Sequence, residues 1–321
     1  MYAIGIDLGA TNVRAVISRP DGDFLGELKE STIKDGPQAL IDQTMGLVDR
    51  ALGRSETGLK DVEGIGIGSV GPLDMKKGTV SPTNIPFKEI PIVESLSDRF
   101  HLPVYLLNDG MAAALGEKWF GIAKGEENFA YVTLSTGIGG GVYVDGRLLL
   151  GKDGNACEIG HLTIDKDQKL KCGCGRRGHW EAYCSGVNIP NFVRYWIEEK
   201  NEKNSPIVEA CRSGSLTSKY LFDRAKKKEP LALQIVEELG RYNAIGFADI
   251  INVYDPSLIT VGGGLALNNE RLILDPIRRR VGEYAVNGLP EITLTPLGDD
   301  VVLYGAVALA FHPEEVLNEQ S

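Results

Sequence analysis

Residues 2–17 decide the fold, and they read Tyr2-Ala-Ile-Gly-Ile-Asp-Leu-Gly-Ala-Thr-Asn-Val-Arg-Ala-Val-Ile17. The pattern is that of a strand, a glycine turn and a second strand, and Asp21-Gly22 follows as another turn. A similar stretch opens the second half of the chain, Ala130-Tyr-Val-Thr-Leu-Ser-Thr-Gly-Ile-Gly-Gly-Gly-Val-Tyr-Val144, followed by Asp145-Gly146. Gly-rich hairpins are common, so the repeat alone does not separate duplication from accident. A duplication predicts two lobes whose glycine turns face each other across a cleft.

Runs of apolar and β-branched residues alternate with helical patterns along the rest of the chain, which predicts an α/β fold. No low-complexity linker separates the halves, so we expect the domain boundary just after the strand that ends at Leu107. The predicted domains are a small α/β domain over 1–107, rejoined by a C-terminal helix over 303–321, and a large α/β domain over 108–302. The predicted strands are Tyr2–Ile6, Gly64–Gly68, Val104–Leu107, Phe129–Leu134, Gly141–Val144 and Leu258–Val261, and the predicted helices are Leu40–Leu52, Met111–Phe120 and several within Val187–Tyr254.

Composition excludes several classes of protein. The 321 residues are 43% hydrophobic and 24% charged, which is typical of a folded protein. The net charge of −10 gives nucleic acid no general attraction. No basic segment precedes Asp7, so the start indicates a strand rather than a signal peptide, and we expect a cytoplasmic protein. The charge-free stretch Asn128–Val144 contains four glycines, which disfavours a membrane span.

Two glycine turns have the parts of a phosphate-binding loop. The segment from Asp7 to Asn12 and the segment from Ser135 to Gly141 both offer glycines, exposed N–H groups and hydroxyl side chains. Neither is a Walker loop, because no Gly-Lys-Ser/Thr follows. The cluster Gly262-Gly263-Gly264 could let the backbone approach an adenosine. The alternative is that all three are plain turns and connectors.

The segment Gly66-Ile-Gly-Ser-Val-Gly71 matches a dinucleotide-binding fingerprint. Pro72 and Asp74 follow, so no amphipathic helix begins there to bind a pyrophosphate. We therefore interpret the segment as a tight turn near the cleft.

Asn108-Asp109 lies where a strand gives way to a helix, which is where α/β sheets place ligands. An acid in this position is commonly a helix N-cap. The functional alternative is a general base that accepts a hydroxyl proton during phosphoryl transfer.

Two histidines and two cysteines gather within 19 positions, in Glu158-Ile-Gly-His161 and Cys172-Gly-Cys174-Gly-Arg-Arg-Gly-His179-Trp-Glu181. These four residues suit a tetrahedral zinc site better than a disulfide framework, and the alternative is a reduced loop without metal. Glu158 and Glu181 flank the ligands. Carboxylates placed by such a loop could accept hydrogen bonds from the hydroxyls of a sugar.

These motifs, in this order, resemble the ROK family of sugar kinases and especially its glucokinase/hexokinase branch, within the hexokinase–actin–Hsp70 superfamily. The resemblance runs from Asp7 to Gly305-Ala-Val-Ala-Leu-Ala. It implies a two-lobed actin-like ATPase (ribonuclease H-like) fold with a cleft between a smaller N-terminal and a larger C-terminal domain. It also implies ATP-dependent phosphorylation of a hexose, with glucose converted to glucose 6-phosphate as the first choice. The implied cofactors are ATP, Mg²⁺ and structural Zn²⁺, and the implied assembly is a homodimer or homotetramer without nucleic-acid or membrane partners.

Carried over to this sequence, the resemblance implies a role for each motif residue. Asp109 would be the base, and the sugar contacts would be Asn84, Asn108, Asp109, Glu158, His161 and Glu181. The nucleotide phosphates and Mg²⁺ would meet Asp7, Gly9, Thr11 and Asn12, the phosphates also Thr136 and Gly137, and the adenosine Gly263 and Gly264. Zinc would be held by His161, Cys172, Cys174 and His179, with the second ring nitrogen of His161 facing the sugar.

Three positions depart from the family pattern. His179 stands where a third zinc cysteine is usual, which makes the expected ligand set His₂Cys₂. Ala10 replaces a common glycine, which costs little if its φ is negative. Met111 replaces a frequent asparagine, so any hydrogen bond from that position is lost.

Three other functions compete. A ROK-type sugar-sensing repressor carries a helix-turn-helix ahead of its kinase-like core, whereas the first phosphate turn here begins at residue 7. An actin- or Hsp70-like ATPase has no use for a zinc loop with hydroxyl-binding acids. An N-acetylhexosamine kinase keeps the chemistry and changes only the sugar.

Overall fold

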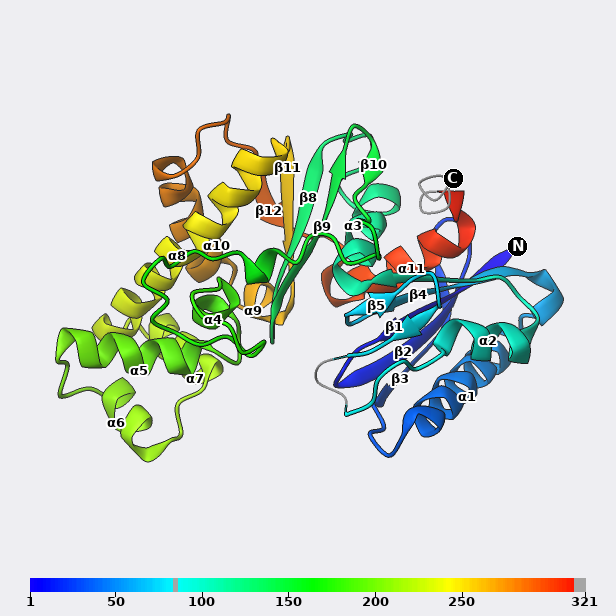
Figure 1. Cartoon of the computed structure of the whole chain (residues 1–321), viewed down its shortest axis with the longest axis horizontal. Helices are drawn as coiled ribbons and strands as arrows, with labels where there is room; N and C mark the ends of the chain where they lie inside the picture. Colours follow the sequence, from blue (N-terminus) through cyan, green and yellow to red (C-terminus); the bar gives the residue numbers. More distant parts are fainter. Residues whose placement is uncertain (83–85, 315–321) are drawn as a thin grey trace. The chain divides into compact units, whose positions relative to one another are not determined.

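The computed structural model describes residues 1–82 and 86–314. Its contacts divide the chain into two compact units (Figure 1). Unit 1 comprises Met1–Tyr131, Gly140–Cys157 and the chain from Thr295 onward, and unit 2 comprises Val132–Gly139 and Glu158–Leu294. Within the described residues, no helix is both long enough and apolar enough to cross a membrane.

The helices and strands follow the predicted α/β alternation closely. The main elements of unit 1 are β1 (Tyr2–Leu8), β2 (Asn12–Ser18), β3 (Phe24–Ser31), α1 (Pro37–Ser55), β4 (Val62–Ser69), β5 (Leu73–Asp74), β6 (Thr79–Val80), α2 (Ile92–Phe100), β7 (Val104–Asn108), α3 (Asp109–Trp119), β10 (Arg147–Leu148) and α11 (Val301–Phe311). Strands β8 (Phe129–Leu134) and β9 (Ile138–Val144) contribute residues to both units. Unit 2 contains α4 (Glu181–Cys184), α5 (Ile189–Lys200), α6 (Pro206–Ser213), α7 (Ser218–Lys226), α8 (Pro230–Tyr254), β11 (Leu258–Gly262), α9 (Gly264–Leu267), α10 (Glu270–Arg280) and β12 (Glu291–Leu294).

The two five-stranded sheets have the same topology. Their strand orders are β3-β2-β1-β4-β7 and β10-β9-β8-β11-β12. When the five strands are counted along each half, both orders read 3-2-1-4-5. This shared order favours duplication over accident as the origin of the repeated hairpins.

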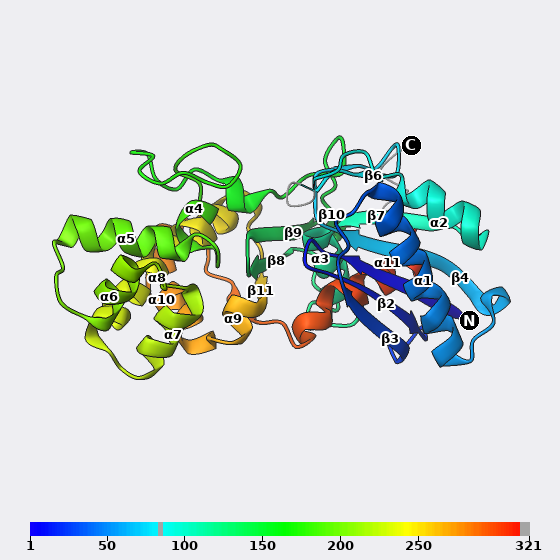
Figure 2. The ribbon, with the colours of Figure 1, turned by 90° about the horizontal axis from the view of Figure 1, so that it is seen from below.

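The sheet of unit 1 is covered by helices on both faces (Figures 1 and 2). Strands β3, β2 and β1 are antiparallel, and β1, β4 and β7 are parallel. Even-numbered residues of β1, including Ile4, Ile6 and Leu8, pack into the apolar core beneath α1 and α2. Residues on the other face, such as Ala3 and Val16, pack against Leu303 and Val307 of α11. Burial of each large side chain of this kind stabilises the fold by roughly 1.5–3 kcal/mol.

The glycines of β4 allow α11 to lie close to the sheet. A Cβ atom on Gly66 would lie 1.9 Å from the carbonyl oxygen of Ala306, and one on Gly68 would lie 2.6 Å from Val302 Cγ1. Residues up to Ser69 belong to the strand, so the interpretation of Gly66–Gly71 as a tight turn is wrong for most of its length. The glycines of this apparent fingerprint serve helix packing.

Helix α3 is fixed in unit 1 by further close contacts of glycine. A Cβ on Gly305 of α11 would lie 1.6 Å from the Ala112 carbonyl oxygen, and one on Gly110 would lie 2.4 Å from the Gly140 carbonyl oxygen. Because α3 packs against α11 and β9 in this way, unit 1 extends beyond the predicted boundary at Leu107. A division of the duplicated halves at that residue stays a prediction.

Candidate active site

Several predicted residues of unit 1 lie at one edge of its sheet. Strands β1, β4 and β7 run parallel, and Asp7 is in register with Gly68, which is in register with Leu107. Asn108 ends β7 and Asp109 begins α3, as the sequence predicts. Since two steps between neighbouring strands span about 10 Å, Asp7 lies about that distance from the end of β7, which Asp109 follows.

The first glycine turn is held by hydrogen bonds within itself and to Thr32. The Gly9 N–H donates to the Asn12 carbonyl at 3.0 Å, and the Thr32 hydroxyl donates to the Gly9 carbonyl at 2.7 Å. Thr11 is exposed at the tip. Ala10 does not have a positive φ, so replacing the usual glycine there causes no backbone strain.

Asp7 is a partly buried carboxyl beside cations. Burial raises its pKa from 3.8 to about 6, while Arg14 and Lys29 oppose that rise. Arg14 itself forms ion pairs with Glu27, at 2.7 Å, and with Asp300. It also donates to the Asp299 carbonyl at 2.9 Å. Arg14 therefore pairs directly with Glu27 and Asp300 and acts on the Asp7 carboxyl through its charge.

The start of α3 is capped by Asn108 rather than by Asp109. Asn108 has extended backbone angles, and its Oδ1 accepts the Gly110 N–H at 2.9 Å. Asp109 Oδ1 accepts the same N–H at 2.8 Å, and Met111 behind it is fully buried. The alternative that Asp109 is simply the N-cap therefore does not describe this helix.

The second glycine turn, in unit 2, is bound to the segment around α4. The Gly186 N–H donates to the Ser135 carbonyl at 2.7 Å, and the Ile138 N–H donates to Glu181 Oε2 at 3.0 Å. Thr136 at the tip is exposed. Gly263, with a φ of +84°, lies against the end of β8, where a Cβ would come within 2.6 Å of the Leu134 carbonyl oxygen. Gly264 then begins α9, so the predicted phosphate and adenosine glycines lie close together in unit 2.

The predicted metal ligands converge. The ligand atoms of His161, Cys172, Cys174 and His179 all lie within 4.8 Å of one another. Cys174 Sγ is 3.3 Å from His179 Nδ1, and Cys172 Sγ is 3.8 Å from His161 Nδ1. Two nitrogens and two sulfurs at these separations form a donor set that fits tetrahedral zinc.

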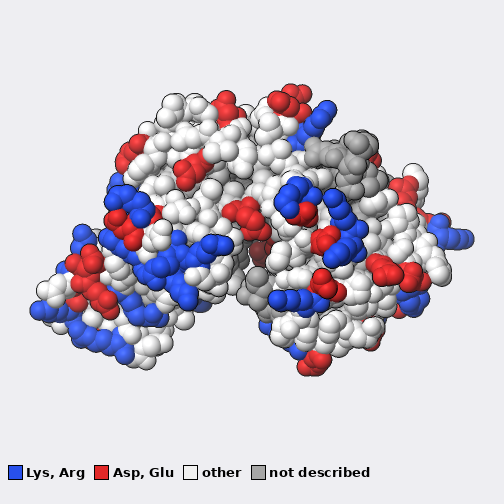
Figure 3. All heavy atoms as spheres, viewed as in Figure 1, with Lys and Arg blue, Asp and Glu red and all other residues white. Residues whose placement is uncertain are grey.

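The surroundings of the cluster favour ligation by neutral imidazole. Burial, His161 and Arg176 lower the pKa of His179. The loop before α4 also carries five basic residues, Lys166, Lys169, Lys171, Arg176 and Arg177. Figure 3 shows Lys and Arg side chains gathered on part of unit 2. Burial raises the pKa of the Cys172 thiol to about 12, and a metal cation bound to its sulfur would lower that pKa.

The loop that carries the predicted metal ligands ends at Trp180, in the core of unit 2. Trp180 is fully buried, and its indole N–H donates to Asn243 Oδ1 at 2.9 Å. It packs directly on Gly246 of α8, where a Cβ would lie 2.3 Å from the indole ring. This anchor holds His179 and Glu181, the neighbours of Trp180 in the chain, in fixed positions.

Glu158, His161 and Glu181 form one group of polar side chains. His161 Nε2 lies 3.8 Å from Glu158 Oε2, on the opposite side of the ring from the metal cluster. Burial raises the pKa of Glu158, His161 opposes the rise and Glu181 adds to it. Glu181 Oε1 also lies 3.5 Å from Cys172 Sγ. This group therefore connects the predicted sugar contacts to the metal ligands.

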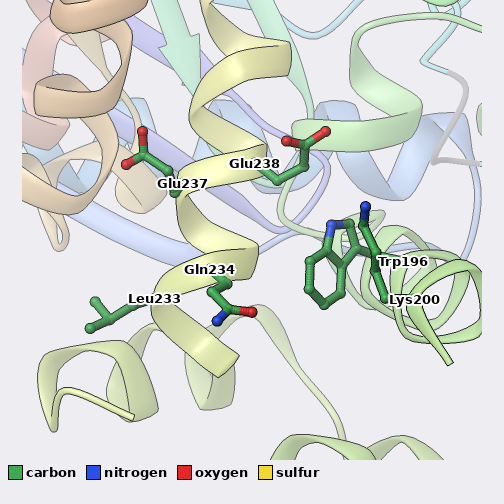
Figure 4. Close-up of a pocket in the computed structure, with 6 residues that line it drawn as sticks. All are labelled: Trp196, Lys200, Leu233, Gln234, Glu237 and Glu238. Carbon is green, nitrogen blue, oxygen red and sulfur yellow. The ribbon is translucent and has the colours of Figure 1, made fainter. Parts of the chain in front are cut away.

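One predicted residue and one groove are not part of the group of residues described above. Asn84, the remaining predicted sugar contact, lies outside the described residues. A groove of about 520 Å³ between α5 and α8, lined by Trp196, Lys200, Leu233, Gln234, Glu237 and Glu238, contains none of the predicted site residues (Figure 4).

Sequence reasoning missed Arg14, although a cation in the apolar run Val13–Ile17 was a usable signal. Its partner Asp300 lies 286 positions away, and no local pattern could indicate that pairing.

The topology of the two sheets defines an actin-like ATPase fold of the ribonuclease H type, and solved structures confirm it. A ROK hexokinase from Thermus thermophilus is 32% identical, with a TM-score of 0.80, and the match covers 98% of this chain and 99% of that one. A ROK family glucokinase from Streptomyces griseus, solved in complex with glucose and AMPPNP, is 31% identical, also with a TM-score of 0.80, over 97% of this chain and all of that one.

Sequence comparison leads to the same group of proteins. A glucokinase from Pyrobaculum calidifontis is 36% identical over 317 residues, which cover 98% of this chain and 97% of that protein. The family model described as "ROK family" matches residues 3–312. The chain therefore belongs to the ROK family, as its motifs predict.

Proposed function

We propose that this protein transfers the γ-phosphoryl group of ATP to the 6-hydroxyl of a hexose, with glucose as the first choice. The observation that carries the proposal is the placement of Asp109 at the first turn of α3, where neighbouring Asn108 provides the cap. The names of the relatives support it, since they are glucokinases and a hexokinase.

Asp109 is the proposed general base. Its carboxylate accepts the 6-hydroxyl proton while the oxygen forms a bond to the γ-phosphorus and the bond from that phosphorus to the bridging oxygen breaks, releasing ADP. Asn108, Glu158, His161 and Glu181 hold the sugar hydroxyls, with Asn84 as a further candidate. Carboxylates and amides at fixed positions are suited to several hydroxyls at once.

The nucleotide is assigned to the glycine turns. Thr11 and Asn12 in the first turn, and Thr136 and Gly137 in the second, offer hydroxyl, amide and N–H donors to phosphate oxygens, as does Gly9. Gly263 and Gly264 leave room beside the adenosine. Asp7 is the proposed carboxylate partner of Mg²⁺, which neutralises phosphate charge when bound.

The cluster of His161, Cys172, Cys174 and His179 is the proposed zinc site. Its four nitrogen and sulfur donors leave no ligand position open, which is typical of a structural rather than a catalytic zinc. The metal would brace the loop that carries Glu181. We further propose a homodimer or homotetramer, which sedimentation can test.

A coupled ATP-consumption assay across a panel of hexoses and N-acetylhexosamines tests the proposal, with zinc quantified in the same sample. We expect ATP consumption that depends on sugar and is fastest with glucose. Faster turnover of an N-acetylated sugar would reassign the substrate. Hydrolysis without any sugar would overturn the kinase assignment.

A further inference from the structure

A loop of unit 1 that precedes Glu158 in the chain is bound to the β5–β6 hairpin through Asn155. The Leu73 N–H donates to Asn155 Oδ1 at 2.9 Å, and Asn155 Nδ2 donates to the Leu73 carbonyl at 2.8 Å. One side-chain amide therefore satisfies both backbone groups of Leu73. It occupies the open edge of β5, where another strand would otherwise pair.

A second contact fixes the same loop. Gly154 has a φ of +78°, and a Cβ there would lie 2.1 Å from the sulfur of Met75, so Met75 packs directly on the glycine backbone. Asn155 Nδ2 also donates to the Asp153 carbonyl, at 3.2 Å, which holds the loop in its turn. The loop is thus attached to the hairpin at two neighbouring points.

The hairpin in turn borders the start of α3. A Cβ on Gly71 would lie 3.1 Å from Asn108 Nδ2 and 3.7 Å from Asn155 Oδ1. The side chains of Asn108 and Asn155 therefore both approach the backbone of Gly71. The Oδ1 atom of the same Asn108 amide caps α3, and Asp109 is the next residue in the chain.

We propose that Asn155 is a positioning residue for phosphoryl transfer. By holding Leu73 at both backbone groups, it keeps Gly71 against the Asn108 amide and so fixes the cap from which Asp109 projects. The inference rests on the proposed role of Asp109 as base. It assigns Asn155 no contact with substrate, and its effect passes through the backbone of residues 71–73.

Steady-state kinetics of Asn155→Ala test the inference. Small displacements of a catalytic group cost up to about a hundredfold in rate, so we expect kcat with glucose to fall about tenfold to a hundredfold. The KM for ATP should change by less than about twofold, because the first glycine turn is not touched. Asn128→Ala is the matched control, since Asn128 is another loop asparagine of unit 1 that accepts a backbone N–H, from Asp145 at 2.9 Å.

Gly71→Ala perturbs the same contact between Gly71 and Asn108, and it replaces Asn155→Ala as the test if that variant does not fold. Its Cβ would displace the Asn108 amide, so we expect a similar loss of kcat. The double variant should lose little more than either single one, because both act on one contact. Losses that multiply, or an Asn155→Ala kcat equal to that of Asn128→Ala, would overturn the inference. Asp109→Asn in the same assay separates the two proposals, because near-normal turnover in that variant removes the base itself.

Discussion

Glu181 Oε2 accepts the backbone N–H of Ile138 at 3.0 Å, and this bond joins a predicted sugar contact to the glycine turn predicted to bind phosphate. The other oxygen of the same carboxylate lies 3.5 Å from Cys172 Sγ. One side chain thus touches the predicted metal ligand Cys172 and the glycine turn, and it belongs to the same polar group as Glu158. Changes at Glu181 should therefore alter more than sugar affinity.

Comparing Glu181→Gln with Glu181→Ala tests this connection. The alanine variant leaves the Ile138 N–H without a partner, at a cost of about 1–3 kcal/mol, so we expect the KM values for both glucose and ATP to rise roughly fivefold to a hundredfold. The glutamine variant retains an oxygen acceptor and should keep the KM for ATP near the wild-type value while the KM for glucose rises. An unchanged KM for ATP in the alanine variant would break the link between the two subsites.

Asp109→Asn should lower kcat by a factor of about 10²–10⁴ while glucose binding is largely retained. The amide keeps the size of the side chain and loses its ability to accept a proton. Turnover measured beside glucose affinity by titration calorimetry checks both parts. Near-normal turnover would show that Asp109 is not the general base.

Loss of the proposed zinc should weaken sugar binding. Cys172→Ser or Cys174→Ser should lose zinc, and the freed loop should lower glucose affinity about tenfold or more through Glu158 and Glu181. Cys211→Ser, a partly buried cysteine of α6 in the same unit, is the matched control and should retain both zinc and affinity. Glucose affinity that is the same in a metal-free variant as in the wild type would refute the coupling.

The ionisation of Asp7 should affect stability. Burial raises the pKa of Asp7 from 3.8 to about 6, so the folded protein holds the proton of this carboxyl more tightly than the unfolded chain does. The stability that results is fully present below pH 3.8 and is lost as the pH rises through 6. Asp7→Asn carries no such penalty, so its free energy of unfolding should gain on that of the wild type between about pH 4 and pH 7. Urea denaturation near both pH values measures the difference, and an identical difference at each would contradict the expected ionisation.

The glycines of β4 should be intolerant of substitution. Gly66→Ala places a Cβ 1.9 Å from the Ala306 carbonyl oxygen, so α11 must move, and we expect a loss of about 1–3 kcal/mol or more. Gly53→Ala, at an exposed position of α1, has nothing within 4 Å of the new Cβ and should stabilise the protein by roughly 0.5–1 kcal/mol. Thermal melting compares the two variants. Equal melting temperatures would show that α11 adapts freely.

Local patterns in the sequence were sufficient to predict much of the fold. Strand β8 was predicted at its observed bounds, and β1, β4, β7 and β11 were predicted within two residues. These strands were predictable because an apolar run and the turn residues that end it are adjacent in the sequence. The convergence of Cys172, Cys174, His161 and His179 was predictable for the same reason, since the four residues lie within 19 positions.

Contacts between distant segments were beyond the reach of those patterns. The role of Gly66 depends on Ala306, and that of Arg14 depends on Asp300, so neither could be recognised before the chain was folded. Asn155 was missed because a single loop asparagine has no distinctive pattern. The extent of unit 1 follows from the packing of α3 against α11 rather than from composition, so no local pattern could indicate it, and the division of the duplicated halves after Leu107 stays a prediction.

The late position of α11 in the chain affects how the protein is made. The sheet face of unit 1 that carries Ala3 and Val16 has its cover only when residues 301–311 have left the ribosome. At synthesis rates of about 5–20 residues per second, the nascent chain must extend for roughly 10–30 s beyond β10 with that apolar surface bare. Truncation ahead of α11, or slow translation of the intervening segment, should therefore yield aggregation-prone chains even though every strand of the first sheet has already been synthesised.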